Sequence, residues 1–247
     1  MKIGRRVLVA AVLTMSLLSC SDIALKDIVA GKVAYSGGPP KVLVILQADY
    51  AQGQAGIKTL LNTLSAYSDI KSVDYVDGSV TTPSVAQLQR YAVVLMASDS
   101  AAADMPTLSD NLATYLDGGG RVVLATFDFS LGYVGGEIQG RLLSQYSPFQ
   151  PFTSSLYLTS FLWSYTAAHP VMAGVANLTV YFRDGVALST GATAIAYYFD
   201  GYPMVAEKGN VVAINAAIHL SNPDDPNGWV GDGWTLLHNA ILYVAHK

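Results

Sequence analysis

Cysteine is nearly absent from this sequence, with Cys20 as the single example among 247 residues. One cysteine cannot form an intramolecular disulfide bond, and it cannot supply the several thiolates of a cysteine-based metal site. Neither a disulfide framework nor a cysteine-based metal centre is therefore expected.

Charge is also scarce, and positive charge is the scarcer sign. Charged residues make up 13% of the chain and hydrophobic residues 51%. Residues 1–19 hold three of the 14 basic residues and none of the 18 acidic ones, which leaves 11 basic against 18 acidic residues, a net charge of −7. Such a surface repels phosphate backbones and anionic lipid headgroups. Nucleic acid is therefore not an expected partner.

A short apolar segment follows the basic residues at the N-terminus. Three basic residues lie among the first six, and the uncharged stretch 7–18 comes directly after them. A stretch of about a dozen residues is too short to span a bilayer as a helix, which takes ~20. The pattern predicts a cleaved export signal.

This segment ends in Leu-Leu-Ser-Cys at positions 17–20, which resembles the lipobox of bacterial lipoproteins. The resemblance implies that Cys20 is acylated, becomes the new N-terminus and is not a catalytic thiol. It divides the chain into a signal peptide (1–19), a lipidated tether (20–40) and one domain (41–247). It also implies membrane attachment in the bacterial cell envelope. In an organism with an outer membrane, Ser21 favours that membrane, since aspartate at this position is the usual inner-membrane retention signal of such lipoproteins.

The first half of the domain alternates between two patterns. Apolar runs predict buried strands at 41–50, 70–78, 91–99 and 121–127. Helical spacing and capping signals predict helices at 56–67 and 107–120, and a short helix opened by Pro83. This alternation is typical of an α/β fold in which helices cover both faces of a parallel sheet.

The second half is less regular. Further strands, several of them antiparallel, are predicted at 178–182, 193–199, 203–207 and 211–218, before an amphipathic closing helix at 233–247. No metal ligand is assigned, since the acidic loop 222–233 lacks the alternating ligand positions of a calcium loop. No cofactor is identified.

The stretch 146–165 is dense in aromatic residues and contains no charged residue. Three interpretations are open: a lid over a binding crevice, ordinary core packing, or a contact patch for a partner protein. As a lid, the stretch would offer Tyr157 and Trp163 as stacking faces for a sugar.

Four stretches resemble the class I glutamine amidotransferase-like superfamily, and within it the branch of trehalose-utilisation-type proteins. They are YLDGGGRVVLA (115–125), HPVMAGV (169–175), YYFDGYPMVAEKGNVVAIN (197–215) and HNAILYVA (238–245). The resemblance implies a flavodoxin-like parallel sheet, with additional strands in the second half.

The chain departs from this superfamily at the nucleophile. Its amidotransferases carry a catalytic cysteine on a tight strand-to-helix elbow, with glycines two residues to either side. The corresponding residues here are Thr126, Asp128 and Ser130, so the thiol and both glycines are missing. Because the elbow needs small neighbours to turn without a clash, glutamine hydrolysis is not expected.

Ligands of open α/β sheets bind beyond the carboxyl ends of the strands. Asp128 and His219 are the candidate catalytic residues, either as an acid–base pair or with a bound divalent cation. His219 follows the strand position at which the resemblance places a catalytic histidine. The candidate ligand-binding residues are Asp49, Ser98, Asp99, Tyr157 and Trp163.

These residues also have structural interpretations. An aspartate directly after a strand is a favoured N-cap of the next helix. A histidine before a loop can lie in a surface turn, and fold analogy alone does not assign function.

Two functions follow. The missing thiol and the lipid anchor favour a binding or scaffold lipoprotein with a catalytically degenerate amidotransferase-like domain, whose partner is a carbohydrate or a protein. The strand-end residues favour instead a carbohydrate-active hydrolase or isomerase that uses Asp128 and His219.

Overall fold

The computed structural model describes residues 38–220 and 228–247. The predicted signal peptide, Cys20 and nearly all of the tether lie outside the described residues. Among the residues that are described, no helix combines the length and the apolar character needed to cross a bilayer.

The described residues form one sheet of ten strands in the order β10-β6-β5-β7-β8-β9-β4-β3-β1-β2. Its parallel part consists of β2 (Ser72–Asp77), β1 (Lys41–Gln47), β3 (Val93–Ser98), β4 (Val122–Ala125) and β9 (Val211–Ile214). The four strands predicted in the first half are all present, each shorter than its apolar run.

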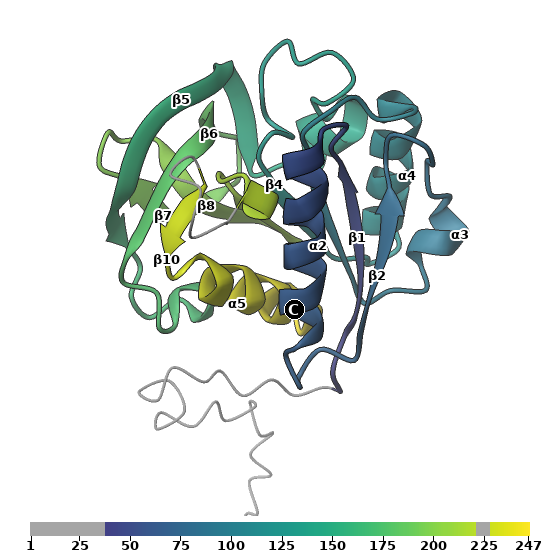
Figure 1. The fold of residues 1–247 in the computed structure, drawn as a ribbon, viewed down its shortest axis with the longest axis horizontal. Coiled ribbons are helices and arrows are strands. Elements are labelled where there is room, and N and C mark those ends of the chain that lie inside the picture. Colours follow the sequence, from purple (N-terminus) through teal and green to yellow (C-terminus); the bar gives the residue numbers. More distant parts are fainter. Residues whose placement is uncertain (1–37, 221–227) are drawn as a thin grey trace, which may run out of the picture.

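Helices cover both faces of this parallel part (Figure 1). On one face, α2 (Ala51–Ser65) and α5 (Gly233–Ala245) pack against alternate strand residues such as Val44. On the other face, α3 (Val85–Leu88) and α4 (Met105–Asp117) pack against the intervening residues of the same strands, such as Ile45. Successive strand residues point to opposite faces of the sheet. A strand that is covered by helices on both faces therefore needs a continuous run of apolar residues. The predicted flavodoxin-like α/β fold is confirmed.

Antiparallel strands extend the sheet from β9 outward. They are β8 (Pro203–Lys208), β7 (Thr193–Tyr198), β5 (Phe149–Tyr165), β6 (Leu178–Leu188) and β10 (Trp229–Gly231). Three short helical turns lie between strands, at Leu142–Tyr146, Pro170–Met172 and Ile218–Leu220.

Most of the aromatic stretch 146–165 is β5, a strand that its sequence pattern does not indicate. Its pairing with β6 shifts register between Pro151 and Ser155 and again between Tyr157 and Ser160. A bulge inserts an extra residue and interrupts the period-two alternation of a strand. The alternation of residues from which β5 could be predicted is therefore interrupted at two places.

Two helix starts differ from the prediction. Helix α2 begins at Ala51, five residues before the predicted start. Helix α4 is capped by Asp104 rather than Thr107, and Asp104 Oδ1 accepts the Thr107 backbone N–H at 3.0 Å. After β4 the chain forms turns where a helix would follow in a regular alternation, so Asp128 caps no helix.

A buried arginine ties β6 to the turn between β7 and β8. The Arg183 side chain is inaccessible to solvent, and its Nε donates to the carbonyl oxygen of Leu158 at 3.0 Å. Its two terminal nitrogens donate to the carboxylate of Asp200. The guanidinium also lies 4.8 Å from the ring centre of Tyr198. Arg183 therefore holds three strands of the antiparallel part together.

Candidate functional site

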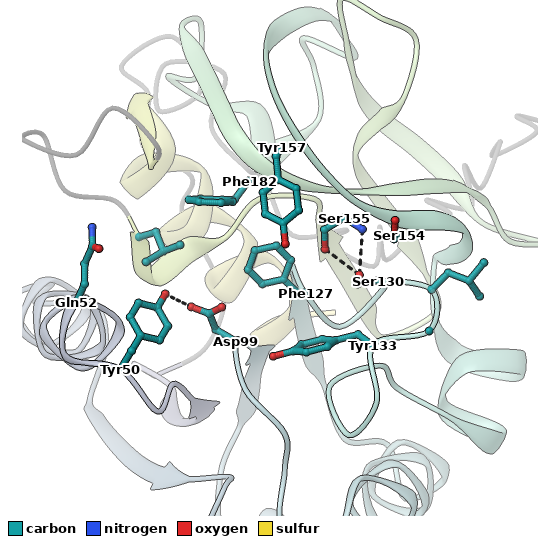
Figure 2. Close-up of a pocket in the computed structure, with 13 residues that line it drawn as sticks. Tyr50, Gln52, Asp99, Phe127, Ser130, Tyr133, Ser154, Ser155, Tyr157 and Phe182 are labelled. Atoms are coloured by element: carbon teal, nitrogen blue, oxygen red, sulfur yellow. Dashed lines mark hydrogen bonds between the residues drawn. The ribbon is translucent and has the colours of Figure 1, made fainter.

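A cavity of about 550 Å3 lies at the carboxyl ends of β1, β3 and β4, where open α/β sheets bind their ligands. One wall comes from the segments that follow these strands, and the opposite wall comes from β5 and β6 (Figure 2). The lining residues are Tyr50, Gln52, Asp99, Phe127, Ser130, Leu131, Gly132, Tyr133, Ser154, Ser155, Tyr157, Phe182 and Leu220. Asp99 is the one charged group among these described lining residues.

The carboxylate of Asp99 is held from two sides. Its Oδ2 lies 2.6 Å from Nε2 of His219 and also accepts the hydroxyl of Tyr50. A carboxylate only accepts hydrogen bonds, so in the pair with a carboxylate at Asp99 the donor is the Nε2–H of His219. The His219 side chain is fully buried, and its Nδ1 has no hydrogen-bond partner among the described residues. His219 therefore supports Asp99 from behind and does not itself line the cavity.

Asp128 lies in a buried layer beneath the cavity. It is inaccessible to solvent, and its two carboxyl oxygens accept the hydroxyl of Ser98 at 2.9 Å and the backbone N–H of Ala125 at 3.4 Å. Gln47 donates to the same Ser98 hydroxyl at 3.1 Å. Burial raises the pKa of Asp128 well above its usual range, and the nearby charge of Asp184 adds to this.

Three oxygen atoms form a chain from the cavity wall into the protein. The hydroxyls of Ser130 and Ser155 lie 2.8 Å apart, and Ser155 Oγ donates to Oδ1 of Asp184 at 3.0 Å. Asp184 Oδ2 accepts the backbone N–H of Phe129 at 3.3 Å. Burial raises the pKa of Asp184 to about 7, although these hydrogen bonds to its charged form oppose the shift.

The side-chain amide of Asn215 fixes the backbone of Asp184. Its Oδ1 accepts the Asp184 N–H at 2.7 Å, and its Nδ2 donates to the Asp184 carbonyl at 2.9 Å. The same Oδ1 accepts the hydroxyl of Thr126 at 3.0 Å. Since Asn215 follows β9, Thr126 follows β4 and Asp184 lies on β6, this residue joins the parallel and antiparallel parts behind the cavity.

Three tyrosines contribute aromatic faces to the cavity, beside Phe127 and Phe182. Tyr50 and Tyr133 lie on either side of Asp99, and Tyr157 reaches in from β5 (Figure 2). Burial, followed by the charges of Asp99 and Asp49, raises the pKa of Tyr133 to about 12, so its hydroxyl stays a donor. The ring of Tyr157 packs edge-on against Phe182, with ring centres 5.6 Å apart.

The structure separates the residues predicted from sequence. Of the candidate ligand-binding residues, Asp99 and Tyr157 line the cavity, whereas Ser98 is buried and Asp49 is exposed outside the lining. Asp128 and His219 are not brought together, because each is buried and bonded to a different partner. Nor do the described residues contain a cluster of three or more His, Cys, Asp or Glu side chains that could hold a metal ion.

Trp163 belongs to a separate aromatic cluster, which consists of Phe161, Trp163 and Phe199. The ring centre of Phe199 lies 5.0 Å from each of the other two. The three side chains are 43%, 63% and 57% exposed, respectively. Neither Trp163 nor its two neighbours line the cavity.

Sequence reasoning missed several cavity residues. Tyr50 and Tyr133 lie in the expected strand-end regions, but nothing in their local pattern marks them as lining residues. Ser155 and Asp184 lie on strands whose mutual pairing brings them to Ser130, and no local signal announces that pairing.

No protein-family model and no curated protein matches the chain. Solved structures do match it. A cytoplasmic protein from Salmonella typhimurium is similar with a TM-score of 0.63 at 13% identity, over 84% of this chain and 100% of the other. A putative ThuA-like protein from Bacteroides uniformis has a TM-score of 0.54 at 14% identity, over 85% and 93% of the two chains.

A glutamine amidotransferase from Thermotoga maritima has a TM-score of 0.53 at 12% identity, over 85% of this chain and 100% of the other. At these identities the likeness shows the fold alone. The chain thus has the amidotransferase-like fold that the sequence motifs resemble.

Proposed function

We propose that this domain is the ligand-binding module of a lipoprotein in the bacterial cell envelope, and that its cavity binds a small, neutral, polyhydroxylated ligand such as a mono- or disaccharide. The observation that carries the proposal is the convergence of three tyrosines, three serines and the Asp99 carboxylate on one cavity. Aromatic faces pack on the apolar faces of sugar rings, and carboxylates accept charge-assisted hydrogen bonds from hydroxyls.

The charge of the cavity supports a neutral ligand. No lysine, arginine or histidine is among its described lining residues, so a phosphate or carboxylate group would meet Asp99 without a cation to compensate it. Asp128 stands where amidotransferases of the superfamily carry their catalytic cysteine, and a membrane anchor is expected at Cys20. Both features agree with a binding role at the envelope rather than with glutamine hydrolysis.

The test is isothermal titration calorimetry of the mature chain in detergent with neutral sugars, a sugar phosphate and choline. A neutral sugar is expected to bind. Asp99→Asn and Tyr157→Ala are each expected to weaken binding about tenfold, which corresponds to about 1.4 kcal/mol. The matched control is Phe152→Ala, which removes an aromatic side chain of the same strand that is 70% exposed and lies outside the cavity.

Three outcomes would contradict the proposal. Binding of choline alone would mean that the tyrosines and Asp99 form a cage for a cation. Binding of the phosphate in preference to the neutral sugar would overturn the charge argument. An equal loss of affinity in Phe152→Ala and Tyr157→Ala would show that the ligand does not bind in the cavity.

A second candidate function is attachment to a partner protein through the aromatic cluster. Exposed groups of large apolar side chains mark contact sites on soluble proteins, and aromatic residues are enriched at interfaces. Trp163→Ser is expected to reduce the size of the particle that carries this protein in solubilised native membranes, measured by native electrophoresis. An unchanged particle size would eliminate this candidate.

A further inference from the structure

The hydrogen-bond chain at the cavity wall has a direction. The only proton of the Ser155 hydroxyl is donated to Asp184, so the hydrogen bond between the two serines must be donated by Ser130. Ser130 Oγ also accepts the backbone N–H of Ser155 at 3.1 Å. A hydroxyl oxygen has two lone pairs, and no other described residue donates a hydrogen bond to Ser130 Oγ, so its second lone pair is not engaged within the described part of the chain.

We propose that Ser130 is a nucleophile, activated through Ser155 by the carboxylate of Asp184, and that it accepts the acyl group of an ester whose alcohol is a small neutral polyhydroxylated compound. The class of alcohol in this inference rests on the proposed function, which assigns a polyhydroxylated ligand to the cavity. The nucleophile, the base and the group between them follow from the geometry alone.

The three residues satisfy the requirements of an activated nucleophile. The nucleophile and its base must be within hydrogen-bond reach, and the base must be oriented by further groups. Here the two steps are 2.8 and 3.0 Å, and Asp184 is oriented by the Phe129 N–H and, through its backbone, by Asn215. Ser130 and Ser155 line the cavity, whereas Asp184 is inaccessible to solvent.

Asp184 has the basicity that this role needs. Burial raises its pKa to about 7, and the charge of Glu137 contributes to the increase. The charge of Asp184 in turn raises the pKa of the buried Asp128. A base whose pKa lies near the working pH is the most effective general base.

The cavity also contains donors for the charge that develops on the substrate. The hydroxyls of Tyr133 and Tyr157 make no hydrogen bond within the described part of the chain, and both residues line the same cavity as Ser130. Hydroxyl donors aimed at a developing oxyanion stabilise the tetrahedral intermediate of acyl transfer.

The reaction balances with water as the second substrate. Ser130 Oγ bonds to the carbonyl carbon while its proton passes to Ser155 and the proton of Ser155 passes to Asp184. When the ester C–O bond breaks, the leaving alkoxide takes a proton from Ser155, which Asp184 replaces. Water then attacks the acyl-serine along the same relay, and it releases the carboxylic acid and restores the Ser130 hydroxyl.

The experiment treats the mature chain in detergent with an alkyl fluorophosphonate. Attack by Ser130 forms an O–P bond and expels fluoride, and peptide mass spectrometry locates the adduct. Label on Ser130 is expected, with a rate that rises as pH increases through about 7. Ser155→Ala and Asp184→Asn are each expected to slow labelling about a hundredfold, the lower end of what a positioned base contributes. Asp184→Asn should also abolish the pH dependence.

Ser160→Ala is the matched control, because Ser160 is a buried serine of the same strand that does not line the cavity. Its labelling rate should equal that of the unaltered protein. Absence of label on Ser130 in the folded protein overturns the proposal, as does an unchanged rate in Ser155→Ala. The Ser155 variant keeps the test valid should Asp184→Asn fail to fold.

The two proposals fail separately. If neutral sugars bind but Ser130 is not labelled, the nucleophile is refuted and the binding function stands. If Ser130 is labelled but no sugar binds or protects it, the nucleophile stands and the polyhydroxylated alcohol is refuted. Protection of Ser130 by a bound sugar supports both.

Discussion

Nε2 of His219 lies 2.6 Å from Oδ2 of Asp99, and of these two side chains only that of Asp99 reaches the cavity. The usual order of a catalytic histidine and its aspartate is thereby reversed: the histidine is the buried support and the carboxylate faces the ligand. His219 is thus a positioning residue, and its loss would affect ligand binding by releasing the carboxylate of Asp99.

Replacement of His219 by alanine is expected to lower both the free energy of unfolding and the affinity for a cavity ligand. A hydrogen bond to a charged group contributes about 1.5–3 kcal/mol, and the buried space left by the imidazole adds to the loss. Urea unfolding and calorimetric titration measure the two effects. His238, which pairs with the exposed Asp69 at 2.8 Å, provides the control, and His238→Ala should cost less stability and no affinity.

The contribution of Asp184 to stability is expected to fall as pH rises from about 4 to about 7. The folded-state pKa of Asp184 is raised to about 7, so the folded protein holds a proton that the unfolded chain releases near pH 4. This contribution is fully present below the unfolded pKa and is lost as pH rises through the folded one.

Urea midpoints at pH 4.5, 6 and 7.5 measure this effect, and Asp184→Asn should flatten the profile over that range. Asp128, whose pKa is raised by burial in the same direction, should leave a residual slope in that variant. Equal slopes in the wild type and in Asp184→Asn would contradict the assignment of a neutral buried carboxyl group, since His169 and His246, whose pKa values are lowered by burial, change stability in the opposite direction in both proteins.

Arg183→Lys is expected to destabilise the fold by about 2–4 kcal/mol, although the charge is retained. A lysine cannot reproduce the two-pronged contact with Asp200 together with the bond to the Leu158 carbonyl, and loss of a buried partner leaves polar groups unpaired. Chemical denaturation measures the loss. Arg141→Lys, at an exposed pair with Asp117, should cause no measurable change, and equal effects of the two variants would refute this role.

Cys20→Ala is expected to move the protein from the membrane fraction to the soluble fraction, because the acyl chains predicted at Cys20 are the anchor. Cell fractionation with labelled palmitate measures this. Ser21→Asp should keep the label but shift the protein to the inner membrane. Label that persists in Cys20→Ala would disprove lipidation at this residue.

The sequence motifs and the apolar runs predicted the parallel half of the fold well. Strands β1 to β4 and helices α3, α4 and α5 follow from patterns carried within each segment. Strand β5 was not predicted, since two bulges disturb its alternation with a period of two. The expectation that an aspartate after a strand caps a helix also does not hold for Asp128, because the chain after β4 forms turns and its carboxyl group bonds to Ser98 and Ala125.

By itself, the sequence determined the α/β class, the end of the sheet where a cavity forms, and the aspartate rather than cysteine at position 128. These properties depend on side-chain periodicity and on residue identity, which are local. Only the tertiary structure decided that Asp99 faces the cavity while His219 and Asp128 do not, and that Ser130 meets Ser155 and Asp184. The contacts of the Ser130–Ser155–Asp184 chain join residues 25 and 29 positions apart, and the one between Ser155 and Asp184 depends on the pairing of β5 with β6.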